Sequence, residues 1–176
     1  HNVHATFMAK PMQEQPGSAM HLHVSVVDIE SGRNLFVNED SSESDQFYHA
    51  LAGMQRYLVA AMPLMAPYVN SYRRQSNSED SPTNLAWGMD NRTVGLRVPM
   101  ADTANRRIEN RIPGADANPY LAMAATLAAL WLGLQEQRRP TRQRKDSGEA
   151  LATLPRNLDI ALDELERAKP LHEALG

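Results

Sequence analysis

Three short stretches of the chain alternate apolar and polar residues with a period of two, and this pattern limits how the chain can fold. The stretches are 20–27, 93–98 and 106–112. Successive side chains of a strand point to opposite faces of its sheet, so each stretch predicts a strand with one apolar and one polar face. In one sheet, the polar faces would bring together two histidines, one carboxylate and three arginines. These residues are His21, His23, Glu109, Arg97, Arg107 and Arg111.

Such a set of side chains suits a divalent metal ion beside phosphate groups. His21 and His23 stand at i and i+2, so both imidazoles can point at one ion or one phosphate, and Glu109 is the natural carboxylate ligand. The alternative is a solvated sheet face on which opposite charges alternate. The residue pattern alone leaves both interpretations open.

Three further segments predict helices. Apolar residues recur at three and four residue steps over 47–61, which predicts an amphipathic helix that ends near Pro63. The segment from Pro119 to about residue 134 follows an asparagine cap and is apolar on nearly every side, so we expect a buried helix. A last amphipathic helix is predicted over 156–169, with its end at Pro170.

The remaining segments predict short strands and loops. Residues 4–9 and 85–88 have strand-like composition, and 35–37 is predicted to return as the second strand of a hairpin. The polar segment 75–83 predicts a long loop, and loops of that length in a compact domain are usually functional or disordered. Because the first residue is not methionine and 4–9 resembles a strand already under way, we expect the chain to be a piece of something larger.

Size and charge exclude several classes of protein. The chain has 176 residues, which suffices for one domain with a core. It contains no cysteine, so disulfides and thiolate chemistry are excluded. The net charge of −3 and the dispersed arginines argue against a nucleic-acid partner. No apolar run approaches the roughly 20 residues that span a bilayer, so we expect a cytoplasmic protein without a membrane partner.

Ordered motifs across more than half of the chain resemble the C-terminal catalytic domain of the glutamine synthetase family. They are Ala5–Pro11, Gly17–His23, Asn70–Arg74, Asn91–Thr93, and Arg106–Arg111 continuing to Asn118–Leu121. The resemblance implies an α+β fold in which an antiparallel-rich sheet has helices packed on one face. It also implies that residues 1–176 are the C-terminal part of one catalytic domain, without the small N-terminal β-grasp domain and the first half of the catalytic domain.

The resemblance also implies roles for the residues of the polar faces. His21 matches a metal ligand of the family, and Glu109 matches a carboxylate ligand of the same ion, Mg²⁺ or Mn²⁺. His23 and Ser25 match positions beside the nucleotide.

Five arginines match groups that bind anionic substrates in the family. Arg74 and Arg111 match residues that grip the amino-acid substrate. Arg92, Arg97 and Arg107 match groups around the ATP phosphates and the transferring phosphoryl group, so Arg92 and Arg97 are assigned to nucleotide binding and Arg92 and Arg107 to catalysis.

Some residues depart from the family pattern. Asp80, the third residue assigned to catalysis, stands where the family usually has a glutamate that closes over the site and helps to bind ammonium. Ala19 replaces a usual glycine. The segments 87–93 and 112–116 look more like the γ-glutamylpolyamine synthetase branch than like the ammonia-using enzymes.

The function implied by the resemblance is an ATP-dependent glutamate–amine ligase. Glutamate is activated as γ-glutamyl phosphate and transferred to an amine, with a polyamine or related amine preferred. The alternatives are a glutamine synthetase that uses ammonia and a non-catalytic family member with a binding or regulatory role. The parent protein is expected to form a ring-shaped homo-oligomer, and the 176 residues alone are expected to bind metal weakly and to be inactive.

Overall fold

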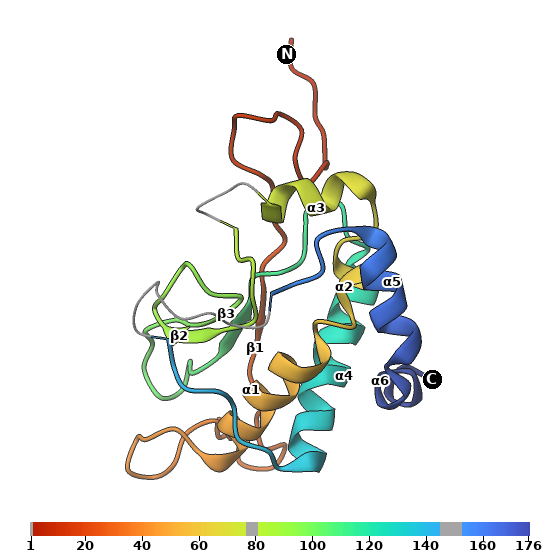
Figure 1. The fold of residues 1–176 in the computed structure, drawn as a ribbon. Helices are drawn as coiled ribbons and strands as arrows, with labels where there is room; N and C mark the ends of the chain where they lie inside the picture. The colour runs from red at the N-terminus through yellow and green to blue at the C-terminus, as the bar shows by residue number, and fades with distance from the viewer. Residues whose placement is uncertain (1, 77–80, 145–152) are drawn as a thin grey trace.

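A four-stranded sheet forms one layer of the molecule, and helices cover one of its faces (Figure 1). The structure is a computed structural model that describes residues 2–76, 81–144 and 153–176. The strands are β1 (Leu22–Val24), β2 (Trp87–Met89), β3 (Leu96–Val98) and β4 (Ile108–Asn110), in the spatial order β1-β4-β3-β2. The β1–β4 and β4–β3 pairs are antiparallel, and β3–β2 is parallel. The expected α+β fold with a mostly antiparallel sheet is confirmed.

The register of the sheet sets the predicted polar side chains in one row. His23 of β1 is opposite Glu109 of β4, and Glu109 is opposite Arg97 of β3. On the other face, Leu96 and Ile108 are fully buried in the core. Directly opposite residues on one face of an antiparallel pair lie close enough to interact. The period-two pattern therefore placed these three side chains on the correct face.

Helices pack against the apolar face of the sheet and against each other (Figure 1). They are α1 (Asp45–Tyr57), α2 (Met62–Met65), α3 (Val69–Ser76), α4 (Pro119–Glu136), α5 (Leu158–Arg167) and α6 (Lys169–Leu175). A buried hydrogen bond of 3.0 Å from Asn110 Nδ2 to Thr126 Oγ1 joins β4 to α4. Within the described residues, no helix is both long and apolar enough to cross a membrane.

Helices α1 and α4 approach each other so closely that glycine is required on both. A Cβ atom on Gly133 would lie 2.2 Å from the carbonyl oxygen of His49, and one on Gly53 would lie 2.3 Å from the carbonyl oxygen of Ala129. Backbone atoms cannot yield as the end of a flexible side chain can. The two glycines therefore permit the close contact between α1 and α4. The expectation that α4 is buried on nearly every side is wrong, because its other side carries exposed residues: Tyr120, Leu127 and Trp131 are 78%, 55% and 56% exposed.

Two predicted strands are wrong in the structure. Residues 4–9 form no strand, and 4–8 are exposed. Ala9 is buried, and its carbonyl oxygen accepts a hydrogen bond of 2.8 Å from the backbone N–H of Ser18 without a strand being formed. Residues 35–37 do not form a second hairpin strand. Val27 and Asn34 instead make one isolated antiparallel bridge, so pairing stops after a single residue pair.

Two prolines begin helices where the sequence analysis expected them to end one. The helix predicted over 47–61 ends at Tyr57, and Pro63 stands in the first turn of α2. The last predicted helix ends at Arg167, and Pro170 stands in the first turn of α6. Proline is tolerated there because the first N–H groups of a helix have no partner within it. Helix α3 was not predicted, and it takes up the start of the predicted polar loop.

The cap of α4 gives a testable contribution to stability. The Asn118 side chain accepts a hydrogen bond of 3.0 Å from the backbone N–H of Tyr120. We expect Asn118→Ala to lower the free energy of unfolding by about 1 kcal/mol, because a helix N–H loses its acceptor. Asn118→Asp retains the oxygen and should cost less, since a negative charge is favourable at a helix N-terminus. Urea unfolding of the full-length protein measures the free energy of unfolding of both variants. Equal losses of stability in the two variants would contradict the capping role of Asn118.

Candidate active site

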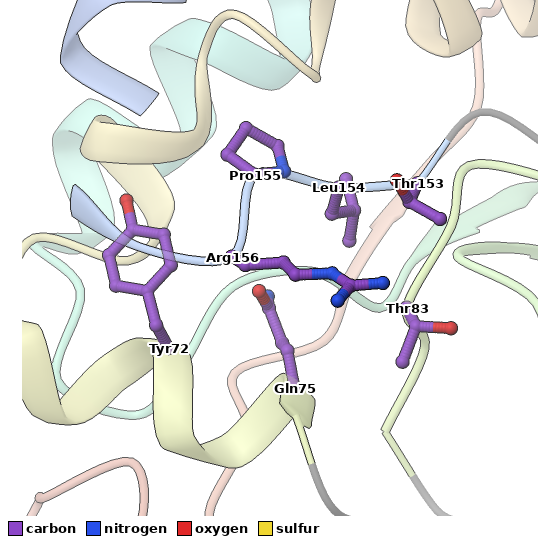
Figure 2. A pocket seen from close by; sticks show the side chains of 7 residues that line it. All are labelled: Tyr72, Gln75, Thr83, Thr153, Leu154, Pro155 and Arg156. Carbon is purple, nitrogen blue, oxygen red and sulfur yellow. The ribbon is translucent and has the colours of Figure 1, made fainter. Parts of the chain in front are cut away.

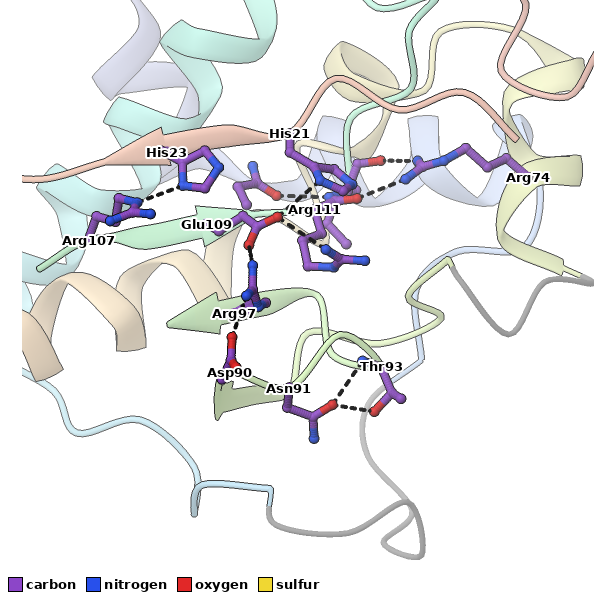
Figure 3. A network of polar contacts seen from close by, with 12 residues as sticks. His21, His23, Arg74, Asp90, Asn91, Thr93, Arg97, Arg107, Glu109 and Arg111 are labelled. Carbon is purple, nitrogen blue, oxygen red and sulfur yellow. Dashed lines mark hydrogen bonds and ion pairs between the residues drawn. The ribbon is translucent and has the colours of Figure 1, made fainter. Parts of the chain in front are cut away.

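Glu109 is the centre of a hydrogen-bonded cluster on the polar face of the sheet (Figure 3). Its side chain is 3% exposed. Its Oε2 accepts a hydrogen bond of 2.7 Å from Arg97 Nη1, and its Oε1 accepts one of 3.1 Å from Arg111 Nη1. Nδ1 of His21 lies 3.0 Å from the same Oε1. Three segments that are distant in the sequence therefore meet at one buried carboxylate.

The surroundings keep Glu109 ionised. Burial alone would raise the pKa of this carboxyl group. The hydrogen bond from Arg97 and the positive charges of Arg111 and Arg97 outweigh burial, so the pKa of Glu109 lies below its ordinary value. A charge-assisted hydrogen bond is also stronger than a neutral one. The carboxylate is thus negative at neutral pH and suited to a divalent cation.

His21 is held in the form that can bind a metal. Burial, followed by the positive charge of Arg111, lowers the pKa of the imidazole below its ordinary value. The neutral ring predominates at neutral pH, and a neutral imidazole nitrogen is a metal ligand. The side chain is 31% exposed, so it remains accessible.

The described residues supply part of a metal site. His21 and Glu109 provide one nitrogen and one carboxylate donor, which fits a divalent ion chemically. Mg²⁺ requires six ligands in octahedral geometry and Mn²⁺ also favours oxygen donors. Among the described residues, no group of three or more histidine, aspartate or glutamate side chains could hold a metal ion. Further ligands must come from elsewhere if the site is to be completed.

Asp90 extends the cluster, and the sequence analysis did not identify it. Arg97 pairs with Asp90 through Nη2 while its Nη1 binds Glu109, so one guanidinium joins two carboxylates. Asp90 follows β2 in a left-handed backbone conformation with φ of 47°. Its backbone N–H donates to the carbonyl oxygen of Val98 at 2.8 Å. Aspartate tolerates this conformation well, so the sequence could indicate a turn at Asp90 but not its pairing with Arg97.

Arg107 lies at the other end of the polar row. Its Nε is 3.1 Å from Nδ1 of His23, and its Nη1 donates to the carbonyl oxygen of Asn105 at 3.0 Å. His23 is exposed and Arg107 is partly exposed. Figure 3 shows the two side chains directed towards each other. A cation and an imidazole on an open polar face can bind an anionic ligand from solvent.

Arg74 supports the backbone beneath the cluster. It is 2% exposed, and its Nη1 and Nη2 donate to the carbonyl oxygens of Ile112 at 2.8 Å and Arg111 at 3.0 Å. Burial, together with the nearby charge of Arg111, lowers the pKa of Arg74 to about 10. The guanidinium remains charged at neutral pH. In this structure Arg74 therefore fixes the backbone at Arg111, and direct contact with a substrate stays a prediction.

Comparison with known proteins identifies the family. The chain matches the family model described as glutamine synthetase, catalytic domain, over residues 1–176. The chain belongs to the glutamine synthetase family. The resemblance drawn from the sequence motifs is thus confirmed.

Relatives in the glutamine synthetase family carry different names. Gamma-glutamylputrescine synthetase PuuA of Escherichia coli (strain K12) is 46% identical over 137 residues, which cover 78% of this chain and 29% of that protein. Glutamine synthetase of Thermococcus kodakarensis is 37% identical over 186 residues, covering 100% of this chain and 41% of that protein. Glutamate–isopropylamine ligase of a Pseudomonas species is 39% identical over 142 residues, which cover 80% of this chain and 31% of that protein.

A solved structure shares the fold. The structure described as "Apo GmaS without ligand" superposes with a TM-score of 0.85 at 34% sequence identity, covering 97% of this chain and 40% of that one. The chain thus spans well under half the length of these relatives.

The structure brings together some of the predicted site residues and leaves others apart. His21, Glu109, Arg97 and Arg111 meet in the Glu109 cluster. Arg92 is exposed in the turn between β2 and β3, and Ser25 is exposed beyond the end of β1. Neither is bonded to the Glu109 cluster in the described part of the chain, so their nucleotide and catalytic roles stay predictions. Asp80 lies outside the described residues.

Proposed function

We propose that residues 1–176 are the C-terminal part of the catalytic domain of an ATP-dependent ligase that joins glutamate to an amine. The observation that carries this proposal is the cluster around Glu109 in a member of the glutamine synthetase family. The cluster places a buried carboxylate and a partly exposed imidazole beside arginines on the polar face of the sheet. That inventory suits a reaction between two anions, ATP and glutamate.

The proposed reaction has two steps. A γ-carboxylate oxygen of glutamate attacks the γ-phosphorus of ATP, the bond to the bridging oxygen breaks, and ADP leaves with γ-glutamyl phosphate formed. The amine nitrogen then attacks the acyl carbon, phosphate leaves with the bonding electrons, and the nitrogen loses a proton to give the amide. Excluding water protects the acyl phosphate from hydrolysis.

The residues of the polar face have distinct parts in this proposal. Arg97 and Arg107 would neutralise phosphate charge, and Arg111 would hold a carboxylate of glutamate. A divalent ion, Mg²⁺ or Mn²⁺, held by His21 and Glu109 with ligands from outside the described residues would neutralise further phosphate charge. In this scheme Arg74 keeps the backbone of Arg111 in place.

The proposed acceptor is a polyamine or a related organic amine. This is supported by relatives whose names specify putrescine and isopropylamine as the amine. A glutamine synthetase that uses ammonia is the alternative, because the relatives of that name match the full length of the chain. A non-catalytic member of the family is the second alternative.

Phosphate release by the full-length protein tests the acceptor. With glutamate and ATP fixed, we expect kcat/KM for putrescine or spermidine to exceed that for ammonium by at least about tenfold, which is within what one additional apolar contact supplies. Simple monoamines separate the contribution of the chain length from that of the second amino group. Reactions without glutamate are the control.

Each outcome of this amine series selects one interpretation. Fastest release with ammonium would show a glutamine synthetase and refute the polyamine assignment. No release with any amine, from a protein that is folded by circular dichroism, would favour the non-catalytic alternative.

A further inference from the structure

A cavity lies between helix α3 and the segment that leads into α5 (Figure 2). Its volume is about 290 Å³, and none of its described lining residues belongs to the Glu109 cluster. A backbone hydrogen bond of 2.9 Å from Leu154 to Thr83 joins two walls of this cavity. The described residues that line it are Tyr72, Gln75, Thr83, Thr153, Leu154, Pro155 and Arg156. We call it the α3 cavity.

Two buried polar atoms in the lining of the α3 cavity have no hydrogen-bond partner among the described residues. They are the hydroxyl group of Tyr72, which is 4% exposed as a residue, and Oε1 of Gln75, which is 6% exposed. Leaving a buried polar group unsatisfied is unfavourable, so such groups usually have a partner in the protein, an ordered water molecule or a ligand.

The orientation of Gln75 is fixed by its other amide atom. Its Nε2 donates to the carbonyl oxygen of Ile112 at 3.4 Å, which leaves Oε1 as the acceptor without a partner. In Figure 2 the amide group points from α3 towards the Arg156 side chain across the α3 cavity. Burial raises the pKa of Tyr72 to about 12, so its hydroxyl group retains its proton and can donate.

The charge of the lining selects the kind of ligand. Arg156 is the charged residue among those described in the lining, and no acidic side chain among them balances it. It is exposed, and its guanidinium extends along the α3 cavity towards Thr83 (Figure 2). A cationic amine would be repelled here, whereas a carboxylate would gain charge-assisted hydrogen bonds. The α3 cavity is thus unsuited to the acceptor amine of the proposed ligase.

We propose that the α3 cavity binds a small carboxylate that also carries an N–H or O–H donor, as an α-amino or α-hydroxy acid does. The carboxylate pairs with Arg156 and the Tyr72 hydroxyl group, and the donor is accepted by Gln75 Oε1. The volume is at the lower end of ligand pockets, which limits the ligand to a small molecule. This site is independent of the ligase proposal, because it uses none of the residues assigned to that reaction.

Calorimetric titration of the full-length protein tests the α3 cavity. The probes are L-serine and L-lactate, which distinguish the amino from the hydroxy acid, acetate, which lacks the donor, and methylammonium, which lacks the carboxylate. Glutamate is left out, because it is itself an α-amino acid and would compete for the α3 cavity; the Arg156→Gln variant distinguishes this cavity from the amino-acid site of the proposed ligase. We expect saturable binding of L-serine or L-lactate, weaker binding of acetate, and no binding of methylammonium.

Three variants locate the binding. Arg156→Gln should weaken the tighter acid by about tenfold or more, because a charge-assisted pair is lost. Tyr72→Phe should weaken it several-fold while leaving the fold intact, since the lost hydroxyl group has no hydrogen-bond partner among the described residues. Arg167→Gln removes an exposed arginine of α5 that does not line the α3 cavity, and should leave binding unchanged.

Several results would overturn the proposal. These are the absence of binding of both acids to the unmodified protein, equal binding of acetate, binding of methylammonium, or unchanged affinity in Arg156→Gln. Thermal unfolding of each variant shows whether a lost affinity reflects lost structure.

Discussion

Replacing Glu109 with glutamine in the full-length protein is expected to lower the rate of phosphate release by at least about a hundredfold. Removing a residue that only hydrogen-bonds to a metal ligand already lowers metal affinity or activity by about 10–100-fold. The same variant should bind Mn²⁺ more weakly by a similar factor. Glutamine has nearly the shape of glutamate but no charge, so Arg97, Arg111 and His21 lose the anion they share. Steady-state phosphate release and Mn²⁺ titration measure the two effects.

Glu43→Gln is the matched control for Glu109→Gln. Glu43 also accepts a hydrogen bond from an arginine, at 2.8 Å from Arg106, but it lies outside the Glu109 cluster. We expect it to leave both activity and Mn²⁺ affinity nearly unchanged. If Glu109→Gln kept full activity with normal Mn²⁺ affinity, the assignment of Glu109 as a metal ligand would be wrong. A lower unfolding temperature without lost Mn²⁺ affinity would assign Glu109 a structural role only.

Replacing Gly133 with alanine should lower the free energy of unfolding by about 3 kcal/mol, at the upper end of the usual cost of overpacking a core. The added Cβ would lie 2.2 Å from the carbonyl oxygen of His49 and 2.6 Å from Cα of Gly53. Helices α1 and α4 must move apart to relieve this contact. In an exposed helix the same change would be stabilising, since alanine has the higher helix propensity. Urea unfolding of the full-length protein gives the sign and the size.

Ala124→Gly in the same helix separates packing from propensity. Ala124 is on the exposed side of α4, so this change should cost about 1 kcal/mol through helix propensity alone. If Gly133→Ala instead stabilised the protein, the close contact between α1 and α4 would be refuted.

Local patterns in the sequence were sufficient for the polar face of the sheet. The direction of a strand side chain follows from its position along the strand, so alternation over 106–112 predicted that Arg107, Glu109 and Arg111 share a face. The caps of α4 and α1 are also local, since a capping side chain bonds a backbone group two or three residues away. The family motifs then predicted the family and its fold, and the match to the family over residues 1–176 confirms this prediction.

Prolines were misread because their effect depends on context. Pro63 and Pro170 prevent a preceding helix from continuing, but they are also favourable in the first turn of a new helix. Whether a new helix begins depends on its packing. The residues fully buried near these positions, Met62 and Leu171, are in the hydrophobic core, and that burial is a long-range property.

The sequence by itself determined which side chains face the site, because side-chain direction in a strand is local. Only the tertiary structure decided that Arg97 pairs with both Asp90 and Glu109. It also decided that the guanidinium of Arg74 donates to two backbone carbonyl oxygens, and that Gly133 packs directly against α1. Each of these contacts joins segments brought together by the order of strands and by the packing of helices. That order follows from the burial of apolar surface over the whole domain, which no short stretch of sequence contains.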